Sequence, residues 1–576
     1  MCSSFGVFNY FLLYTLVVEV FKEVVMSALL SEDYLNDYIS PALACTKPTE
    51  IKKEKFVTED GEFQVGVEPQ ELEKVTISLS DCLACSGCIT SSEEIMLSQQ
   101  SHSVFLDAWR ELGFDKCGSA GDAQCTNKLV VSISPHCRAS MARYYGVDVD
   151  AADYAILRVF KEVFHATSVI GDGAGRLLSV KRVVEELMER RKASQGTALS
   201  SICPGFLIYT EKTKPKLVPM LLNVKSAQQV TGALFKEIAL EEGYDVDTSL
   251  KDGKRTNVQY HLTIVPCFDK KLEASRPDGE GEVNCVITPR EVLAMLGEMG
   301  VSFRKYLGDW ASLDKQLQQS QLGMLRAEMS PAGWDPLLHW SIPANGDGYS
   351  DGYAYQYACT VRDAHVASGC AAQVVSVPGK NADVLEYRVV EPNSEGGKVI
   401  ARACVLSGFR NIQNLCRKLD PSGHKKRSVR RVAALRSRGR KDSSSEDSTG
   451  TPSAISNALG GTANPAECDY VEVSACPSGS INGGGLLMEL APEREEMGET
   501  PLPSSTIGGN ARRRQQQLQE LQAMYKAQIR ITDETPTSLP PAALPPLPPQ
   551  YTMQYTFYIQ EEDPAKPDIV TVGNTW

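Results

Sequence analysis

The sequence predicts an α/β fold in which mainly parallel sheets are covered by helices on both faces. One observation is that an apolar run, LVVSIS, begins at Leu129 and precedes a helical pattern, RLLSVKRVVEELMERR, that ends at Arg191. A second observation is that the same succession of strand and helix recurs further along the chain. Alternating strands and helices are typical of parallel sheets buried on both faces.

The later elements follow from similar patterns. Pro289–Met299 is a predicted helix, because proline is favoured in a first helical turn. Arg512–Ile529 is a second predicted helix, and it has apolar side chains on one face. Those side chains are Leu518, Leu521 and Tyr525. Three short apolar segments are predicted strands, namely Leu262–Val265, Val399–Leu406 and Tyr470–Ser474.

Composition narrows the class of protein. The 576 residues are enough for about two to four domains with sizeable cores. Hydrophobic residues make up 42% and charged residues 23%, as in an ordinary soluble globular protein. The net charge of −13 argues against a general nucleic-acid-binding function, which requires a basic face.

Cysteine is the most informative residue type. The chain has 17 cysteines and 7 histidines. An odd number of cysteines without regular pairing is a poor disulfide framework. A long, thiol-rich chain without a convincing export signal is typical of a reducing compartment, where thiolates are free to bind metal.

Residues 1–25 are interpreted as a leader or a dispensable extension. Their apolar stretch, Phe5–Val20, is short for a membrane span, lacks a basic start and shows no small-residue cleavage site. Met26 begins a segment that is typical of a soluble N-terminus. A membrane anchor is the alternative, and we expect no membrane association.

Two later stretches interrupt the α/β pattern. Residues 421–465 contain a basic run followed by a Ser/Thr/Gly/Pro-rich run, and we expect a disordered, solvated insertion there. A nuclear signal or a phosphate-binding patch is the alternative reading of the basic run. Pro536–Pro549 contains seven prolines and is predicted to be an extended spacer.

Three cysteines form the strongest local motif. Cys82, Cys85 and Cys88 are separated by two residues each, a spacing that suits three corners of a cubane iron–sulfur cluster. Cys45 is the candidate fourth ligand, because it is the upstream cysteine outside the doubtful leader. Zinc and unligated thiols remain alternatives, although no second two-residue knuckle accompanies the motif.

A further three cysteines lie in loops beside predicted strands. They are Cys203 in SSICPGF, Cys267 in IVPCFDKKLEASR and Cys476 in VEVSACPSGSINGGG. Each has a neighbouring proline that stiffens the loop, and glycines after Cys476 allow backbone to approach a bulky group. For any one of them taken alone, an inert buried thiol is the favoured interpretation.

Together these motifs resemble those of a known family. ICPG, VPCFDKKLEASR and VEVSACPSGSINGGG are similar to the three cluster-binding motifs of iron-only hydrogenases. They resemble more closely the hydrogenase-like factors of cytosolic iron–sulfur protein assembly, the nuclear prelamin A recognition factor-like proteins. LNDYISPALACTKP and DCLACSGC resemble the N-terminal cluster module of that assembly family. The resemblance covers about Leu35 to Leu487.

The resemblance implies two [4Fe–4S] clusters. Cys45, Cys82, Cys85 and Cys88 would hold the first, and Cys203, Cys267 and Cys476 would hold the second between two hydrogenase-like lobes. The implied organisation is a leader (1–25), a cluster module (26–100), a two-lobed domain (125–420 and 466–530), an insertion (421–465), a spacer (531–550) and a tail (551–576).

Three positions depart from the hydrogenase pattern, and a fourth matches it. Ile202 stands where hydrogenases carry a proton-transferring cysteine, and Val265 stands where they carry methionine. Ser480 occupies the position of the cysteine that bridges the cubane to the di-iron site, and a hydroxyl is a poor ligand for soft iron–sulfur chemistry. Lys270 matches the family, but a lysine–carboxylate pair with Glu273 can simply hold a loop.

Cys468 is not expected to replace Ser480 as a ligand. It lies eight residues before Cys476, across a strand that would span on the order of 20 Å.

The function implied is cluster handling without hydrogenase activity, as an adaptor or carrier. The implied partners are an early assembly scaffold, a late targeting complex and apo iron–sulfur clients, in the cytoplasm or also in the nucleus. Trp576 is the candidate contact to the targeting complex, because the family associates an aromatic C-terminal residue with that recognition. The alternatives are a hydrogenase-type or electron-transfer enzyme, and a nuclear interaction protein with structural clusters.

Overall fold

The computed structural model describes most of the chain from residue 100 onward. The described residues are 100–116, 126–246, 257–346, 349–392, 398–420, 462–491, 511–532 and 553–558, together with the antiparallel strands β1 (Phe56–Val57) and β2 (Phe63–Gln64). The chain divides into two compact units, Met1–Ile89 and Thr90–Trp576. The predicted leader, the N-terminal cysteine motif, residues 421–461 of the predicted insertion and the C-terminal Trp576 lie outside the described residues.

The first lobe of the larger unit contains a four-stranded parallel sheet. Its strand order is β4-β3-β6-β7. All three pairings are parallel, which requires helical crossovers between the strands. The strands are β3 (Lys128–Ile133), β4 (Ser168–Gly171), β6 (Gln259–Ile264) and β7 (Cys285–Ile287).

The second lobe contains a five-stranded mixed sheet in the order β5-β12-β11-β10-β9. β5, β12 and β11 are mutually parallel, whereas β10 runs antiparallel to both of its neighbours. The strands are β5 (Ala198–Leu199), β9 (Gln373–Pro378), β10 (Val384–Glu391), β11 (Lys398–Ser407) and β12 (Tyr470–Ser474).

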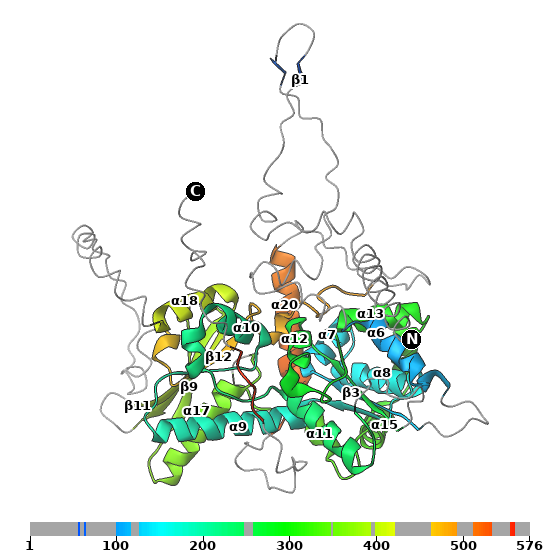
Figure 1. Cartoon of the computed structure of the whole chain (residues 1–576), viewed down its shortest axis with the longest axis horizontal. Coiled ribbons are helices and arrows are strands. Elements are labelled where there is room, and N and C mark those ends of the chain that lie inside the picture. The colour runs from blue at the N-terminus through cyan, green and yellow to red at the C-terminus, as the bar shows by residue number, and fades with distance from the viewer. Residues whose placement is uncertain are drawn as a thin grey trace, which may run out of the picture. The chain divides into compact units, whose positions relative to one another are not determined.

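A long helix connects the two lobes. α9 (Gly173–Lys192) begins directly after β4 of the first sheet and leads to β5 of the second sheet. It packs against α11 (Ala227–Glu241) and against α17 (Tyr353–Ala367), and Figure 1 shows it running from one to the other. The first helical pattern of the sequence therefore forms the element that joins the lobes.

The remaining elements cover the sheets or the space between them. Around the first sheet lie α6 (His102–Glu111), α7 (Pro135–Tyr145), α8 (Val149–Glu162), α13 (Pro289–Glu298), α14 (Phe303–Ala311) and α15 (Lys315–Glu328). The others are α10 (Pro204–Thr213), α12 (Asp269–Ala274), α16 (Pro336–His339), β8 (Ser341–Pro343), α18 (Phe409–Leu419), α20 (Ala511–Gln528) and β13 (Arg530–Thr532). Short 3₁₀ turns are η2 (Phe114–Lys116), η3 (Pro215–Met220), η4 (Pro277–Gly279), η6 (Pro465–Glu467) and η7 (Ser480–Asn482).

Local sequence explains where the predicted helices begin. α13 starts with Pro289 after a capping box, in which the Thr288 side chain accepts from the Glu291 N–H and the Glu291 carboxylate accepts from the Thr288 N–H. In α20, Leu521 and Tyr525 are buried in the core of the first lobe, as the apolar face of this segment predicts. The predicted α/β fold class is confirmed.

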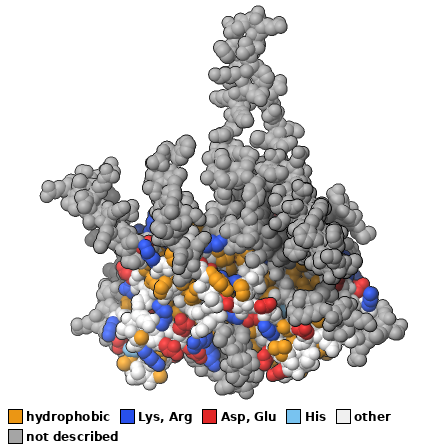
Figure 2. All heavy atoms as spheres, in the orientation of Figure 1, with side chains coloured by type: hydrophobic (Ala, Val, Ile, Leu, Met, Phe, Trp, Pro, Cys, Tyr) orange, Lys and Arg blue, Asp and Glu red, His pale blue; other side chains and the backbone are white. Residues whose placement is uncertain are grey.

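Two cores stabilise the lobes separately. One surrounds the parallel sheet and includes Phe105 of α6, so the first lobe contains residues before the predicted start at residue 125. The other lies between the mixed sheet and helices α9 and α17. Among the described residues, no helix is both long and apolar enough to cross a membrane. Acidic and basic side chains are interspersed on the described surface seen in Figure 2.

Candidate metal centre

Each cysteine of the predicted second cluster follows the carboxyl end of a strand. Cys203 lies beyond β5, Cys267 beyond β6 and Cys476 beyond β12. β5 and β12 are parallel neighbours in one sheet, whereas β6 belongs to the other. Loops at the carboxyl ends of parallel strands are the usual place for ligands in α/β folds, and these three loops meet between the lobes.

The thiols of these cysteines converge. The pKa of the Cys476 thiol is raised well above its usual range. The largest cause is a hydrogen bond with Cys267, and burial is the second. The pKa of the Cys203 thiol is raised to about 12, mainly by burial and to a smaller extent by the charges of Asp269 and Cys267. The thiols of Cys203 and Cys476 therefore keep their protons at neutral pH unless a metal cation displaces those protons. A metal centre or iron–sulfur cluster supplies such positive charge, so the arrangement fits one.

A backbone amide also points at this group of sulfurs. The N–H of Ala475 donates to Sγ of Cys203 over 3.3 Å. Phe206 N–H lowers the pKa of the same thiol by a further backbone hydrogen bond. Amide donors of this kind stabilise negative charge on sulfur and help to set the potential of iron–sulfur centres.

The glycine run after Cys476 lies against the second cysteine motif. A Cβ on Gly483 would lie 2.2 Å from the carbonyl oxygen of Pro266, so a larger residue would force the backbone apart. The N–H of Gly485 donates to that same oxygen over 3.0 Å. The third motif is therefore attached directly to the residue that precedes Cys267.

A narrow cavity of about 30 Å³ lies beside the cysteine motifs. Its lining includes Ile202, Val265 and Ser480, the three residues that the family resemblance marks as departures from the hydrogenase motifs. Ile202 and Val265 are buried apolar side chains that hold no exchangeable proton. Lys270 and Asp351 line the cavity as well.

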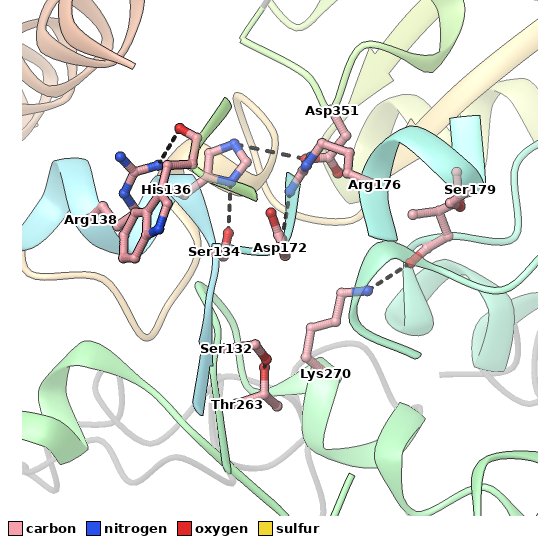
Figure 3. A network of polar contacts seen from close by, with 12 residues as sticks. Ser132, Ser134, His136, Arg138, Asp172, Arg176, Ser179, Thr263, Lys270 and Asp351 are labelled. Carbon is pink, nitrogen blue, oxygen red and sulfur yellow. Dashed lines mark hydrogen bonds and ion pairs between the residues drawn. The ribbon is translucent and has the colours of Figure 1, made fainter. Parts of the chain in front are cut away.

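Charged side chains form a buried network at this cavity (Figure 3). Arg176 of α9 donates to the carboxylates of Asp172 and Asp351. Burial alone would raise the pKa of Asp351, but Arg176 and His136 lower it to about 2. Burial lowers the pKa of His136 to about 4, although Asp351 opposes this effect. At neutral pH the network therefore combines an ionised Asp351 with a neutral imidazole.

Lys270 joins the first and second cysteine motifs. Its ammonium donates to the carbonyl oxygen of Ile202 over 3.3 Å and to the Glu273 carboxylate over 2.8 Å. Glu273 is buried and also accepts from the hydroxyl of Tyr555. The lysine–carboxylate pair thus holds the loop beside Cys203, which is the simple structural role considered for it from the sequence.

Comparison with known proteins gives the family. Residues 127–484 match the family described as iron only hydrogenase large subunit, C-terminal domain. The chain is 43% identical to the cytosolic Fe-S cluster assembly factor NAR1 of Saccharomyces cerevisiae, over 96% of this chain and 100% of that protein. It is 41% identical to the protein of the same name from Kluyveromyces lactis, again over 96% and 100%.

The chain belongs to this hydrogenase-like family of cytosolic Fe–S cluster assembly factors. The resemblance predicted from the cysteine motifs is therefore confirmed. Among solved structures, a variant of apo [FeFe]-hydrogenase HydA1 from Chlamydomonas reinhardtii aligns with a TM-score of 0.46 and 18% identity, over 77% of this chain and 93% of that chain. The HydA(deltaEFG) [FeFe]-hydrogenase aligns with a TM-score of 0.46 and 18% identity, over 76% and 91%.

Within this assembly-factor chain, the structure adds residues that sequence reasoning missed. Asp172 and Arg176 follow the carboxyl end of β4, a position that could have marked them from the sequence. Asp351 and Tyr555 had no such signal, because each reaches the site from a distant segment. Cys137 is also close to Cys267. Burial is the main cause that raises the pKa of the Cys137 thiol, and the charge of Cys267 contributes to it.

Other predicted residues are placed elsewhere or are not described. Cys468 lies before the start of β12 and is hydrogen-bonded to Cys404, whereas Cys476 lies beyond the end of β12. The predicted N-terminal ligands Cys45, Cys82, Cys85 and Cys88 lie outside the described residues, and so does Trp576. Their roles remain predictions of the assembly-factor resemblance.

Proposed function

We propose that this chain binds iron–sulfur clusters and acts in cytosolic iron–sulfur protein assembly, as a carrier or adaptor between an assembly scaffold and a targeting complex. The similarity to assembly factors over nearly the whole chain supports a role in cytosolic iron–sulfur protein assembly. The convergence of Cys203, Cys267 and Cys476 between the lobes is the observation that carries the proposal.

The inner site would hold a [4Fe–4S] cluster through these three thiolates. Ser480 lines the cavity beside the cysteine motifs, and the family resemblance puts it at the fourth-ligand position. A second [4Fe–4S] cluster would be held by Cys45, Cys82, Cys85 and Cys88, whose spacing supports a cubane. Cluster binding and transfer, with apo iron–sulfur proteins as clients, would then be the activity in the cytoplasm.

Hydrogen turnover is not part of the proposal. It would require a proton donor at position 202 and a thiolate at position 480, and the chain carries isoleucine and serine there. These two residues support a cluster-binding site rather than a redox enzyme with a di-iron centre.

Iron and sulfide analysis of the anaerobically purified full chain tests the proposal. Two cubanes predict about eight irons and eight sulfides per chain, and one cubane predicts about four. Cys203→Ala and Cys85→Ala should each remove about half of the iron. Paramagnetic resonance of the reduced protein should show the corresponding loss of one signal. A chain without iron after anaerobic reconstitution would contradict the proposal.

A further inference from the structure

Three potential metal ligands meet on the second lobe, at residues separate from the cluster cysteines. They are His365 in the last turn of α17, Cys370 just beyond that helix, and Glu391 at the end of β10. Their ligand atoms all lie within 4.8 Å of one another. Among the described cysteines, Cys370 is the exposed one.

The end of α17 brings Cys370 back over His365. Gly369 adopts a left-handed conformation with φ of 89°, which turns the chain at the helix end. The N–H of Gly369 donates to the carbonyl oxygen of Val366 over 2.9 Å, and that of Cys370 donates to the carbonyl oxygen of His365 over 3.3 Å. This is a Schellman motif, in which the side chains corresponding to His365 and Cys370 commonly meet through an apolar contact. Here that pair consists of an imidazole and a thiol.

The sheet register independently holds Glu391 at the same place. β9 begins at Gln373, three residues after Cys370, and Gln373 pairs with Val390 of β10. Glu391 follows Val390, so the antiparallel pairing fixes it beside the loop that carries Cys370. Two separate local structures, a helix C-cap and a strand pairing, therefore converge on this triad.

The distances between the groups leave room for a cation. Nε2 of His365 lies 3.9 Å from a carboxylate oxygen of Glu391, which is longer than a hydrogen bond. That nitrogen is buried and has no hydrogen-bond partner in the structure. A zinc ion at about 2.0–2.2 Å from both atoms would fit within this separation.

We propose that His365, Cys370 and Glu391 bind one Zn²⁺ ion. A thiolate, an imidazole and a carboxylate are the ligands that zinc takes, whereas calcium and magnesium require oxygen ligands alone. Binding releases the proton of the Cys370 thiol to solvent and leaves a fourth coordination position for water. The bound ion would join the end of α17 to the end of β10 in the mixed sheet.

Zinc competition on the cluster-loaded full chain tests this site, because the loaded clusters occupy the seven cysteines proposed as their ligands. We expect the wild type to take up one equivalent of Zn²⁺ against a chromophoric chelator. Cys370→Ser, His365→Gln and Glu391→Gln should each weaken this binding by at least about tenfold. Cys359→Ser, which alters a cysteine within α17 itself, should bind Zn²⁺ as the wild type does.

Cobalt provides a second readout. Co²⁺ added to the cluster-loaded wild type should give a thiolate-to-cobalt charge-transfer band in difference spectra, and Cys370→Ser should abolish it. Gly369→Ala keeps all three ligands but strains the turn, so it should weaken Zn²⁺ binding without removing the band. Equal zinc affinity in the wild type and in Cys370→Ser would overturn the proposal and leave only a His365–Glu391 ion pair with an unrelated thiol nearby.

Discussion

Ser480 is the residue whose predicted departure from the hydrogenase pattern has the most direct chemical consequence. It begins η7 immediately after the left-handed Gly479, so its position is fixed by the same turn that carries Cys476. A hydroxyl there cannot offer the soft anionic ligand that an iron–sulfur cluster favours. One iron of the proposed inner cluster should therefore be more exchangeable than the other three.

Ser480→Cys tests this expectation. The substitution restores a thiol at the same backbone position with little change in volume. We expect greater iron retention in air and less of any three-iron paramagnetic signal than in the wild type. No hydrogen evolution should appear, because Ile202 still lacks an exchangeable proton. Equal iron content and identical spectra would mean that another group completes the site or that the inner cluster is absent, and Cys203→Ala distinguishes these outcomes.

His339 controls part of the dependence of stability on pH. Its side chain is buried against Trp334, with ring centroids 4.9 Å apart, and neither ring nitrogen has a hydrogen-bond partner in the structure. Burial lowers its pKa from 6.5 to about 4, and Asp335 offsets this only partly. The unfolded chain therefore binds more protons between pH 6.5 and 4, and stability falls as the pH decreases through this window.

His339→Phe should flatten this dependence. The ring contact with Trp334 is kept while the titrating nitrogens are removed, so the stability lost between pH 7.5 and 5 should decrease, by at most about 2 kcal/mol. At pH 7.5 the variant should be at least as stable as the wild type. Urea midpoints at the two pH values measure the effect. Parallel pH profiles for the two proteins would show that His339 does not titrate in this way.

At the scale of elements, a short C-terminal segment binds the loops near the cluster cysteines. Residues 553–558 cross the start of α11 and the end of α12. The carbonyl oxygen of Met553 accepts from Lys225 N–H over 2.8 Å, and the Tyr555 hydroxyl accepts from Ser226 N–H over 3.1 Å. The same hydroxyl donates to Glu273, the partner of Lys270. The segment therefore supports the loop that carries Cys267.

Tyr555→Phe should loosen this segment. It removes one donor from the buried Glu273 carboxylate and should cost about 1–3 kcal/mol of unfolding free energy. We expect faster amide exchange at Thr556, whose N–H donates to Asp278 over 2.7 Å. The matched control is Tyr558→Phe, because the Tyr558 side chain is exposed and its recorded hydrogen bond to Glu211 uses the backbone N–H. Equal exchange rates in both variants would contradict a supporting role for the Tyr555 hydroxyl.

At the scale of the whole molecule, the segment 553–558 is the described part of the predicted C-terminal tail, residues 551–576. The last eighteen residues follow Tyr558 and end at Trp576. Through the Tyr555 hydroxyl, the segment 553–558 is attached to α12, which follows the loop of Cys267. A terminal indole on such a tail can be buried in a partner pocket without altering the fold.

Removal of Trp576 should weaken binding to the targeting complex and leave the iron content unchanged. Trp576→Phe keeps an aromatic ring and should retain most of the binding. Co-purification with targeting-complex proteins, together with iron analysis of the same samples, measures both properties. Unaltered binding after removal of Trp576 would refute its role as a contact, whereas loss of iron would indicate a structural role instead.

The sequence by itself determined the local features of this protein. Proline at a first helical turn marked the start of α13, and apolar spacing marked the buried face of α20. The cysteine motifs gave the family, and the residues at positions 202 and 480 gave the departure from hydrogenases. These properties depend on neighbours within a few positions, so a linear pattern contains them.

Only the tertiary structure decided which distant groups meet. Cys203, Cys267 and Cys476 come together because parallel strands of two sheets end at one place between the lobes. Asp351 contacts Arg176 from 175 positions away in the chain, and Tyr555 contacts Glu273 from 282 positions away. His365 and Glu391 meet through a helix cap and a strand register acting together. Such contacts depend on long-range packing, which local sequence patterns do not specify.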